Sequence, residues 1–513
     1  MPVNFSSMLV DLDPTLPNTS QLFFDDLTVG IQGGPRIHMP NNGPMVARYI
    51  NFGRNPSLEI AGTASVIWQA SCVEGLFLDV SDSPVLVAMK ESIDSGAADG
   101  LTVRINAYRT IYFDGPPVPA NLDDRFTALR DRVKGGGFQP NPARSLIVGA
   151  VGLHRHGEPP AVPGDRQLSG NLGTAFARLD RDTKQLTVDL ANTVPETDFA
   201  ATKADLGELP VAAGDTLLGT LDYGDYDQVA YRETAGLVTI DLDDDLLDAA
   251  ESSDLALSSS STQAAITEQS LTAVVEPPNV YLEGADRASV VVQILRHGVP
   301  VTEQIRVQVA EVQRSIPAPA PQMQLQVVDT DAQGRVRLTF SSDGSTSLQV
   351  YPGSSQWVLT PFEGSAPAAP TSTDNARDCY VATRVTPADD DIAALPPTWA
   401  NVYQHVLIDW HALAPCMDNW LPLGNEAECR RMAAVIKALT SVDHFDNFDY
   451  MPVTRGMTKG QRTLLHKWCD DTAPPGPATA LITEDATTTE LPIASETTPI
   501  DLSRGFSSPD PMG

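Results

Sequence analysis

The chain has 513 residues, and its 66 acidic and 34 basic side chains give a net charge of −32. A field of this sign repels nucleic acids and anionic membrane surfaces, so neither is expected as a partner. The length exceeds what one hydrophobic core can hold and suggests roughly three domains. The hydrophobic content of 42 % is that of an ordinary globular protein.

The cysteine content and the N-terminal sequence indicate the cellular compartment in which the protein is expected. The five cysteines are widely spread, with no CxxC or CxxH spacing: Cys72, Cys379, Cys416, Cys429 and Cys469. They predict neither a disulfide framework nor a zinc site. The start, MPVNFSSMLVDLDP, lacks a basic region followed by an apolar run, and the longest apolar stretch, near LIVGAVGL, is about eight residues. A cytoplasmic protein without a membrane segment is expected.

The first half of the chain has sequence patterns typical of β-strands. Runs rich in Val, Ile, Leu, Thr and Tyr stand between turns rich in Pro, Gly and Asp, at 101–113, 144–157, 186–194 and 236–242. A short helix is expected at 121–133. Residues 1–255 are therefore predicted to form a β-rich domain, either a sandwich or barrel-like.

The composition changes after residue 243, where serine-rich polar text predicts a linker at 256–275. Short strands with regular turns resume at 276–365, which predicts a small immunoglobulin-like β-sandwich. A second Pro/Ala/Ser/Thr-rich stretch predicts another linker at 366–396.

Residues 397–470 predict a short helical unit. Helical spacing joins the apolar positions Trp399, Val402, Tyr403, Val406, Leu407, Trp410, Leu413 and Ala414. Asn425 with Glu428, and Thr458 with Gln461, are typical of helix N-caps. The Pro/Thr-rich acidic text of 471–513 predicts a disordered tail. The fold class expected is mostly β, or α+β overall.

Two pairs of histidines are candidates for metal chemistry. His154 and His156 lie two apart on a predicted strand, so both could face one side, but no third ligand can be named and a solvent-facing strand end is favoured. His405 and His411 are six apart, which turns them roughly 120° from one another on a helix. Shared coordination is disfavoured, and either residue alone remains a candidate axial haem ligand.

Acidic clusters could hold Ca²⁺ through oxygen ligands at Asp222, Asp225 and Asp227, and at Asp241, Asp243, Asp244 and Asp245. Neither has the spacing of a calcium loop, and solvated acidic loops are favoured. The glycines of 135–137 lack a phosphate-loop context, and no Glu-x-x-His pair occurs. We therefore assign no catalytic, cofactor-binding or metal-binding residue and no cofactor. A cluster of exposed basic residues is expected in the helical unit: Arg430, Arg431, Arg455, Lys459 and Arg462.

Several stretches nevertheless resemble one family. They are GLTVRINAY (100–108), LIVGAVGLHRHGEPPAVPGDRQL (146–168), LTVDLANTVP (186–195), NVYLEGADR (279–287), VYQHVLIDWHALAPCMDNWLPLGNEAECRRMAAVIKAL (402–439) and YMPVTRGMTKGQRTLLHKW (450–468). Together they are similar to the N-terminal half of the chromopyrrolate synthases, the iminophenylpyruvate-dimer synthases of violacein and rebeccamycin biosynthesis. In that family a ferritin-like half follows, and the enzymes couple oxidised aromatic amino-acid imines with iron or haem. Here an acidic tail follows instead, so no catalytic residue is carried over.

Three functions remain open. The preferred hypothesis is a non-catalytic accessory or structural protein that assembles with a separately encoded protein partner or as a homo-oligomer. The resemblance also permits a stand-alone haem- or iron-dependent enzyme that couples aromatic imines, with His405 or His411 as axial ligand. The third is a structural component of a larger assembly.

Overall fold

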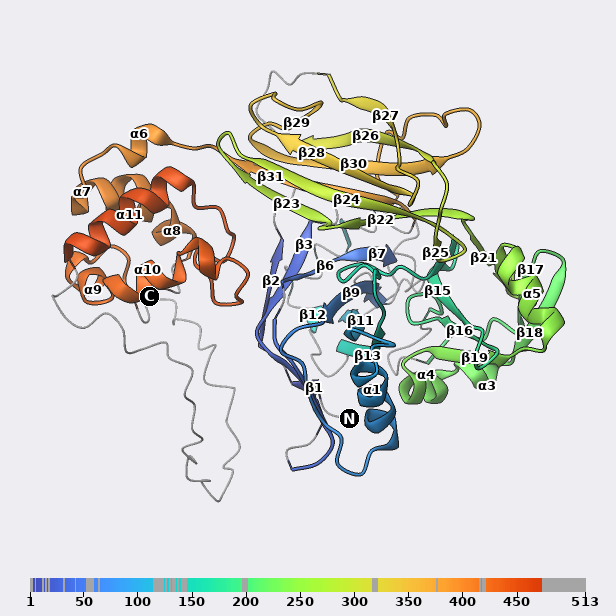
Figure 1. The fold of residues 1–513 in the computed structure, drawn as a ribbon. Coiled ribbons are helices and arrows are strands. Elements are labelled where there is room, and N and C mark those ends of the chain that lie inside the picture. The colour runs from blue at the N-terminus through green and yellow to red at the C-terminus, as the bar shows by residue number, and fades with distance from the viewer. Residues whose placement is uncertain are drawn as a thin grey trace.

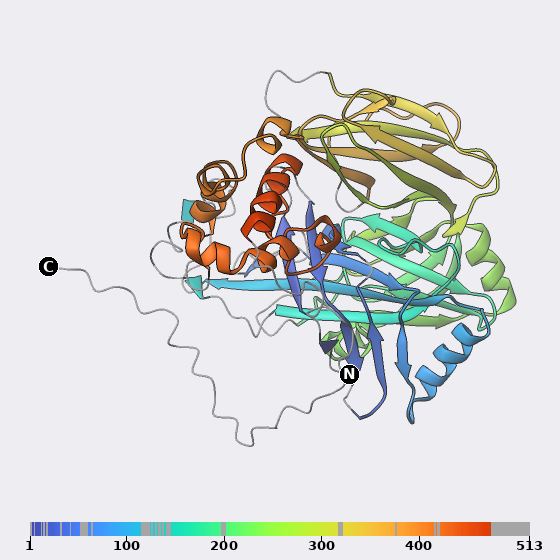
Figure 2. The same ribbon diagram turned by 60° about the vertical axis from the view of Figure 1, so that its left-hand side comes forward.

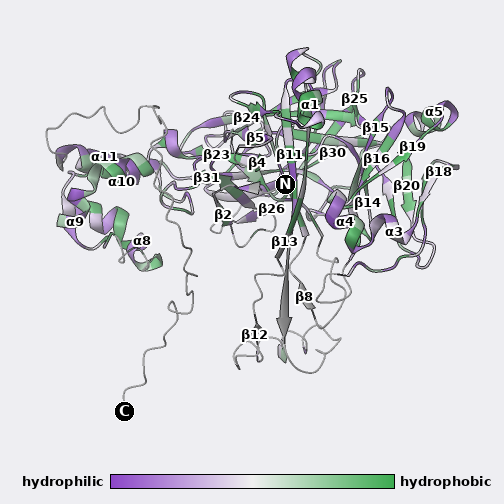
Figure 3. Cartoon of the chain, turned by 90° about the horizontal axis from the view of Figure 1, so that it is seen from below, coloured by the Kyte–Doolittle hydropathy of each residue, from purple (hydrophilic) through white to green (hydrophobic). Residues whose placement is uncertain are grey.

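The computed structural model describes residues 3–472 apart from 52–59, 114–123, 140–144, 196–201, 316–321 and shorter gaps of one to three residues. The fold is mostly β with a helical unit at the C-terminal end of the described part, as predicted. Four units follow one another along the chain, namely the N-terminal sheets, an eight-stranded sheet, a two-sheet sandwich and the helical unit (Figure 1). Seen from below, the helical unit and the eight-stranded sheet lie on opposite sides of the N-terminal sheets (Figure 3).

The N-terminal sheets share one core. Their strands are β1 (Val3–Asn4), β2 (Ser7–Asp11), β3 (Ser20–Phe24), β4 (Leu27–Gly30), β5 (Arg36–Met39), β6 (Met45–Val46), β7 (Arg48–Asn51), β8 (Ile60–Gly62), β9 (Ser65–Cys72), β10 (Phe77–Asp79), β11 (Gly100–Phe113), β12 (Phe138–Gln139) and β13 (Ser145–His154). They form sheets in the orders β1-β4-β5-β10, β2-β3-β6 and β12-β11-β9-β7, with β13 and β8 also paired to β11. Helix α1 (Pro84–Asp94) begins at the cap Ser83 and buries Leu86 in this core. The predicted strand at 101–113 is confirmed, whereas the helix expected at 121–133 lies largely outside the described residues.

A second core lies under the eight-stranded sheet, so the β-rich region expected over 1–255 holds two cores. The strand order is β18-β17-β20-β21-β14-β15-β16-β19. The strands are β14 (Arg166–Gly170), β15 (Gly173–Asp180), β16 (Gln185–Asp189), β17 (Leu209–Ala213), β18 (Thr216–Leu221), β19 (Leu237–Asp241), β20 (Leu255–Ser258) and β21 (Ala265–Glu268), with helices α3 (Tyr223–Tyr226), α4 (Gln228–Thr234) and α5 (Asp244–Ser252).

The linker predicted at 256–275 was wrong, because β20, β21 and the first sandwich strand occupy this stretch. Leu257 and Ile266 are buried in the second core. Ser259, Ser260 and Ser261 lie in the turn between β20 and β21, where the Ser259 hydroxyl donates to the Leu206 carbonyl at 2.6 Å. A serine-rich turn therefore looked like a longer flexible segment.

The sandwich extends beyond its predicted bounds at both ends. One sheet has the order β22-β24-β28-β29 with β25 on β24, and the other β23-β31-β30-β26-β27. The strands are β22 (Leu271–Glu276), β23 (Asn279–Glu283), β24 (Arg287–Arg296), β25 (Val299–Pro300), β26 (Arg306–Ser315), β27 (Leu325–Asp329), β28 (Arg335–Ser341), β29 (Leu348–Gln349), β30 (Gly353–Phe362) and β31 (Cys379–Thr386). Both sheets bury side chains in one core around Trp357. The linker expected at 366–396 was wrong, because β31 lies between β23 and β30 and is needed to complete the second sheet.

The helical unit contains α6 (Asp390–Ala393), α7 (Trp399–Val402), a π-helix at Tyr403–Leu407, α8 (Ile408–Leu413), α9 (Glu426–Arg431), α10 (Ala433–Leu439), a 3₁₀ turn at Val442–His444 and α11 (Lys459–Thr472). Both predicted N-caps are confirmed, and the reciprocal side-chain bond is present at Thr458. Asn425 accepts from the Ala427 amide at 3.1 Å, and Thr458 and Gln461 bond reciprocally.

The apolar face predicted for the first helix is buried at Val402, Val406 and Leu407, but Leu413 is 74 % exposed. The π-helix adds one residue to its turn, and the helical spacing therefore loses register beyond it. Of the tail predicted over 471–513, Asp471 and Thr472 belong to α11, and the rest lies outside the described residues. None of the helices in the described part of the chain has both the length and the apolar character needed to cross a bilayer.

Arg48 joins the N-terminal sheets to the sandwich. Its side chain is 3 % exposed and donates to the Tyr380 hydroxyl at 2.9 Å, the Pro278 carbonyl at 3.2 Å and the Asn279 side-chain oxygen at 3.3 Å. Its guanidinium carbon lies 4.0 Å from the centre of the Tyr380 ring. One side chain thus satisfies buried acceptors on two sandwich strands and stacks on an aromatic ring.

Replacing Arg48 with Met is expected to lower the free energy of unfolding by about 3 kcal/mol, because several buried acceptors lose their donor. Urea denaturation followed by fluorescence would measure the change. Arg287→Met is the matched control, since Arg287 is exposed on β24 and its ion pair with Asp343 is a long surface contact of 3.8 Å. This variant should lower the free energy of unfolding by less than about 1 kcal/mol. Equal stability of the two variants would show that Arg48 does not secure this junction.

Candidate functional site

A cleft of about 630 Å³ lies where the N-terminal sheets, the sandwich and the helical unit meet. The helical unit packs beside the sandwich edge and the N-terminal sheets in Figure 2. The N-terminal sheets contribute lining residues from β3, β6 and β9, and the helical unit contributes residues 442–462. Clefts between domains are common places for small-molecule sites.

The floor of the cleft is the outer face of the parallel pair β23 and β31. Val280 and Leu282 point into the sandwich core, so alternation turns Asn279, Tyr281 and Glu283 outward. The register places Tyr281 beside Arg384 of β31, and both residues line the cleft. The strand period therefore collects amide, phenol, carboxylate and guanidinium groups on one surface.

Two buried polar atoms at this floor have no hydrogen-bond partner, namely one carboxylate oxygen of Glu276 and the side-chain nitrogen of Asn279. Glu276 ends β22, directly before Pro277 and Pro278. Burial raises the pKa of its carboxyl to about 7, although an amide of Ala161 and the charge of Arg48 act in the opposite direction. Buried polar atoms usually find partners, so these two indicate where a ligand would bond.

The arginines of the cleft differ in how far they are neutralised. Arg462 of α11 lies 2.5 Å from Glu283 in an ion pair. Arg455 donates to three carbonyl groups and stacks 3.4 Å from the centre of the Phe23 ring, and burial lowers its pKa to about 10. Both were expected to be exposed, which was wrong: they are 8 % and 2 % exposed, because they join the helical unit to its neighbours.

Arg384 is the third arginine of the cleft and is half-buried. Its guanidinium donates to the Thr454 carbonyl at 2.8 Å, and burial lowers its pKa. Tyr281 stands beside it, packed edge to face on Phe445 with ring centres 4.8 Å apart, and its hydroxyl donates to Gln21. The floor thus combines a cation that has spare donors with an aromatic wall.

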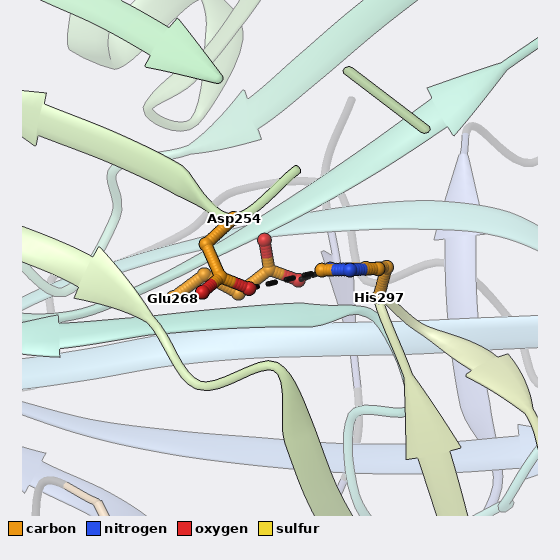
Figure 4. Close-up of side chains that lie close together, drawn as sticks. All are labelled: Asp254, Glu268 and His297. Carbon is orange, nitrogen blue, oxygen red and sulfur yellow. Dashed lines mark hydrogen bonds and ion pairs between the residues drawn. The ribbon is translucent and has the colours of Figure 1, made fainter. Parts of the chain in front are cut away.

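Asp254, Glu268 and His297 form a three-residue cluster whose ligand atoms lie within 4.8 Å of one another (Figure 4). In the described part of the chain this is the single such cluster. A metal ion does not fit it well, because the Arg166 guanidinium already occupies the Glu268 carboxylate, with Nε at 2.8 Å from Oε1 and a second contact to Oε2. The cluster is an ion-pair network that joins the eight-stranded sheet to the β24–β25 turn.

A second hollow, of about 790 Å³, lies beside that network. Its arginines are largely paired. Arg178 contacts Glu158 and Asp165, and Arg296 contacts Glu303. This hollow therefore offers a ligand fewer free hydrogen-bonding and charged groups than the cleft does.

His154 and His156 both reach the carboxylate of Asp99, so they face one side, as their spacing allowed. The favoured interpretation of a solvent-facing strand end was wrong for His154, which is 5 % exposed. The Nδ1 of His154 lies 2.5 Å from one oxygen of Asp99, and that of His156 lies 3.1 Å from the other. The Nε2 of His154 faces the Glu158 carbonyl at 3.1 Å. Both ring nitrogens of His154 are thus engaged.

His405 and His411 are not brought together. His405 is exposed within the π-helix, while the Nδ1 of His411 lies 3.0 Å from the Tyr403 hydroxyl. Neither lines the cleft.

The acidic clusters serve as helix caps. Asp222 and Asp225 form a capping box at α3, and Asp227 and Asp243 accept from amides at the starts of α4 and α5. The aspartates are largely exposed, as expected, but most of them lie at helix starts and not in the solvated loops that were favoured. Of the glycines at 135–137, two lie outside the described residues.

No family model and no curated protein matches this chain. The site is therefore defined by its geometry. Glu276, Asn279, Tyr281 and Arg384 were not predicted as site residues from sequence patterns. A signal was present in LTAVVEPPNVYLEG, where a lone carboxylate ends an apolar strand before two prolines, and in VATRV, where a lone arginine interrupts another.

The raised pKa of Glu276 makes stability depend on pH. Its ordinary pKa is 4.5, so between pH 4.5 and 7 the unfolded chain releases a proton that the folded chain keeps. The contribution of this group to the free energy of unfolding therefore falls by about 3 kcal/mol as the pH rises through that window and stays constant above it. Glu276→Gln should lose this dependence in urea denaturation between pH 4 and 8. The exposed Glu233→Gln is the matched control, and parallel pH profiles for wild type and Glu276→Gln would contradict the burial of this carboxyl.

Proposed function

We propose that this chain is a binding protein that holds a small molecule in the cleft and serves as the non-catalytic accessory subunit of a separately encoded partner. The observation that supports ligand binding best is the pair of buried, unpartnered polar atoms on Glu276 and Asn279 at a cleft between three units. An unsatisfied buried polar atom costs about 1–3 kcal/mol, and a ligand that bonds to it would recover that free energy.

The stretches that resemble the chromopyrrolate synthase N-terminal half support the same site. Three of them, 146–168, 279–287 and 450–468, are far apart in sequence, yet all contribute residues to the cleft. The stretches that carry the resemblance therefore also supply residues of the proposed site. This favours a binding role shared with that family over a purely structural role shared with it.

A second candidate function is acid–base catalysis by Glu276. A carboxyl with a pKa of about 7 in a cleft is suited to exchange protons at neutral pH. Its neighbours are engaged, however: Glu283 pairs with Arg462, and the Tyr281 hydroxyl donates to Gln21. The iron- or haem-dependent alternative has less support, because His405 and His411 lie apart from the cleft.

Filling the entrance of the cleft should abolish ligand capture. Val442 is 58 % exposed and lines the cleft, so Val442→Trp narrows it without disturbing a core. The full chain would be purified from its source organism, denatured and extracted, and the extract examined by mass spectrometry. We expect a small molecule near one equivalent with wild type and with Val435→Trp, a matched change at a 43 % exposed valine on α10, and a loss of at least about tenfold with Val442→Trp. Equal recovery from all three proteins would contradict the proposal.

A partner would need a surface, and the edge strand β27 offers one. Leu325 and Val327 are 54 % and 46 % exposed on its outer side, with no Lys or Pro in the strand to discourage pairing. Because the strand ends its sheet, its outer backbone edge is open to β-augmentation.

Leu325→Lys with Val327→Lys should therefore reduce co-purification of a partner at least about tenfold, because two charges would be desolvated at the contact. Quantitative mass spectrometry of complexes from the source organism would measure the recovery. Val299→Lys, at a 64 % exposed position on β25, is the control. Recovery of the wild-type chain alone at every salt concentration would count against assembly.

A further inference from the structure

The cleft contains one cation whose bonding capacity is largely unused. Arg384 has five N–H donors, and one of its nitrogens donates to Thr454. In the described part of the chain no carboxylate lies within ion-pair distance of it, and the acidic residue whose charge acts on its pKa is Asp13, outside the cleft lining. The other two arginines of the cleft are held by Glu283 and by backbone carbonyls. Arg384 is therefore the arginine that can accept a new anionic partner.

A second donor lies on the same floor. The side-chain oxygen of Asn279 accepts from Arg48, which fixes the amide orientation and leaves the buried nitrogen without a partner. Asn279 is 9 % exposed. In the parallel register it lies two residues before Tyr281, the neighbour of Arg384, which is roughly 7 Å along the strands. One small molecule can span that distance.

The balance of charge limits the ligand further. Glu276, Glu283, Asp286 and Asp446 also line the cleft, and one spare guanidinium faces them. A second negative charge on the ligand would lack a partner in this acidic protein. Tyr281 and Phe445 provide an apolar aromatic wall next to the cation. A carboxylate on an apolar body suits this arrangement better than phosphate or another multiply charged anion.

We infer that the ligand of the cleft is a small organic monocarboxylate whose carboxylate is bound by Arg384 and Asn279, with its apolar part against Tyr281 and Phe445. This inference rests on the proposed function and specifies its ligand class. Arg384 provides the charge-assisted, potentially bidentate bond, and Asn279 provides a neutral donor at a fixed position.

The test uses benzoate as the carboxylate probe on the full-length chain at low salt, followed by calorimetry and ligand-observed NMR. Benzyl alcohol supplies the neutral analogue and inorganic phosphate the other oxyanion. We expect benzoate to bind at least about tenfold more tightly than either. Arg384→Met should weaken benzoate binding at least about tenfold, and Arg287→Met should leave it within about twofold.

Asn279→Asp is a second variant that preserves the oxygen facing Arg48 and replaces the donor by an acceptor. It should also weaken benzoate binding at least about tenfold, so the inference remains testable if Arg384→Met does not fold. Unchanged benzoate affinity in the folded variants, absence of benzoate binding to wild type, or tighter binding of phosphate would each overturn it. Recovery of a neutral molecule with the purified chain would overturn this inference while leaving the proposed binding function standing.

Discussion

The geometry of the cleft depends on the contacts of one buried arginine. Arg48 leaves the N-terminal sheets and satisfies acceptors on Pro278, Asn279 and Tyr380. These residues belong to the strand pair that forms the cleft floor or lie directly before it. The same contact orients the amide of Asn279 and places a positive charge near Glu276. The guanidinium therefore determines both how two units sit together and which polar atoms face the cleft.

The helical unit is held to this frame by a different kind of contact. Arg455 makes no ion pair with a described residue and instead fills its donors with carbonyl oxygens while stacking on Phe23. Arg462 reaches Glu283 across the cleft edge. Gly460 comes so close to α6 that a Cβ there would lie 2.0 Å from the Asp389 carbonyl oxygen. Polar, directional contacts of this kind fix orientation more strongly than an apolar interface of similar size would.

Much of the fold could be predicted from local pattern. The strands around 101–113 and 276–365, the helix caps at Asn425 and Thr458, and the mostly β class follow from side-chain period and capping chemistry. The errors at 256–275 and 366–396 arose because short strands there are stabilised by partners distant in sequence, which local composition does not reveal. Leu413 was misplaced because a π-helix shifted the register.

The site was harder to predict than the fold. Glu276 and Arg384 are the single charged residues of otherwise largely apolar strands, and their importance depends on which groups surround them. Arg455 and Arg462 have the sequence context of surface residues, yet both are buried between units. Tertiary contacts decide whether a charge is solvated or desolvated, and a sequence pattern carries little information on that point.

The parallel pairing of β23 with β31 has a consequence for the order in which the molecule forms. Tyr281 and its neighbour Arg384 are roughly a hundred residues apart in the chain, and strands β24 to β30 of the sandwich lie between them. On the ribosome, the N-terminal sheets emerge and can fold first, while β31 emerges only after all other sandwich strands. A nascent chain therefore gains its ligand pocket late in synthesis, and truncated translation products would lack it even where their earlier sheets are intact.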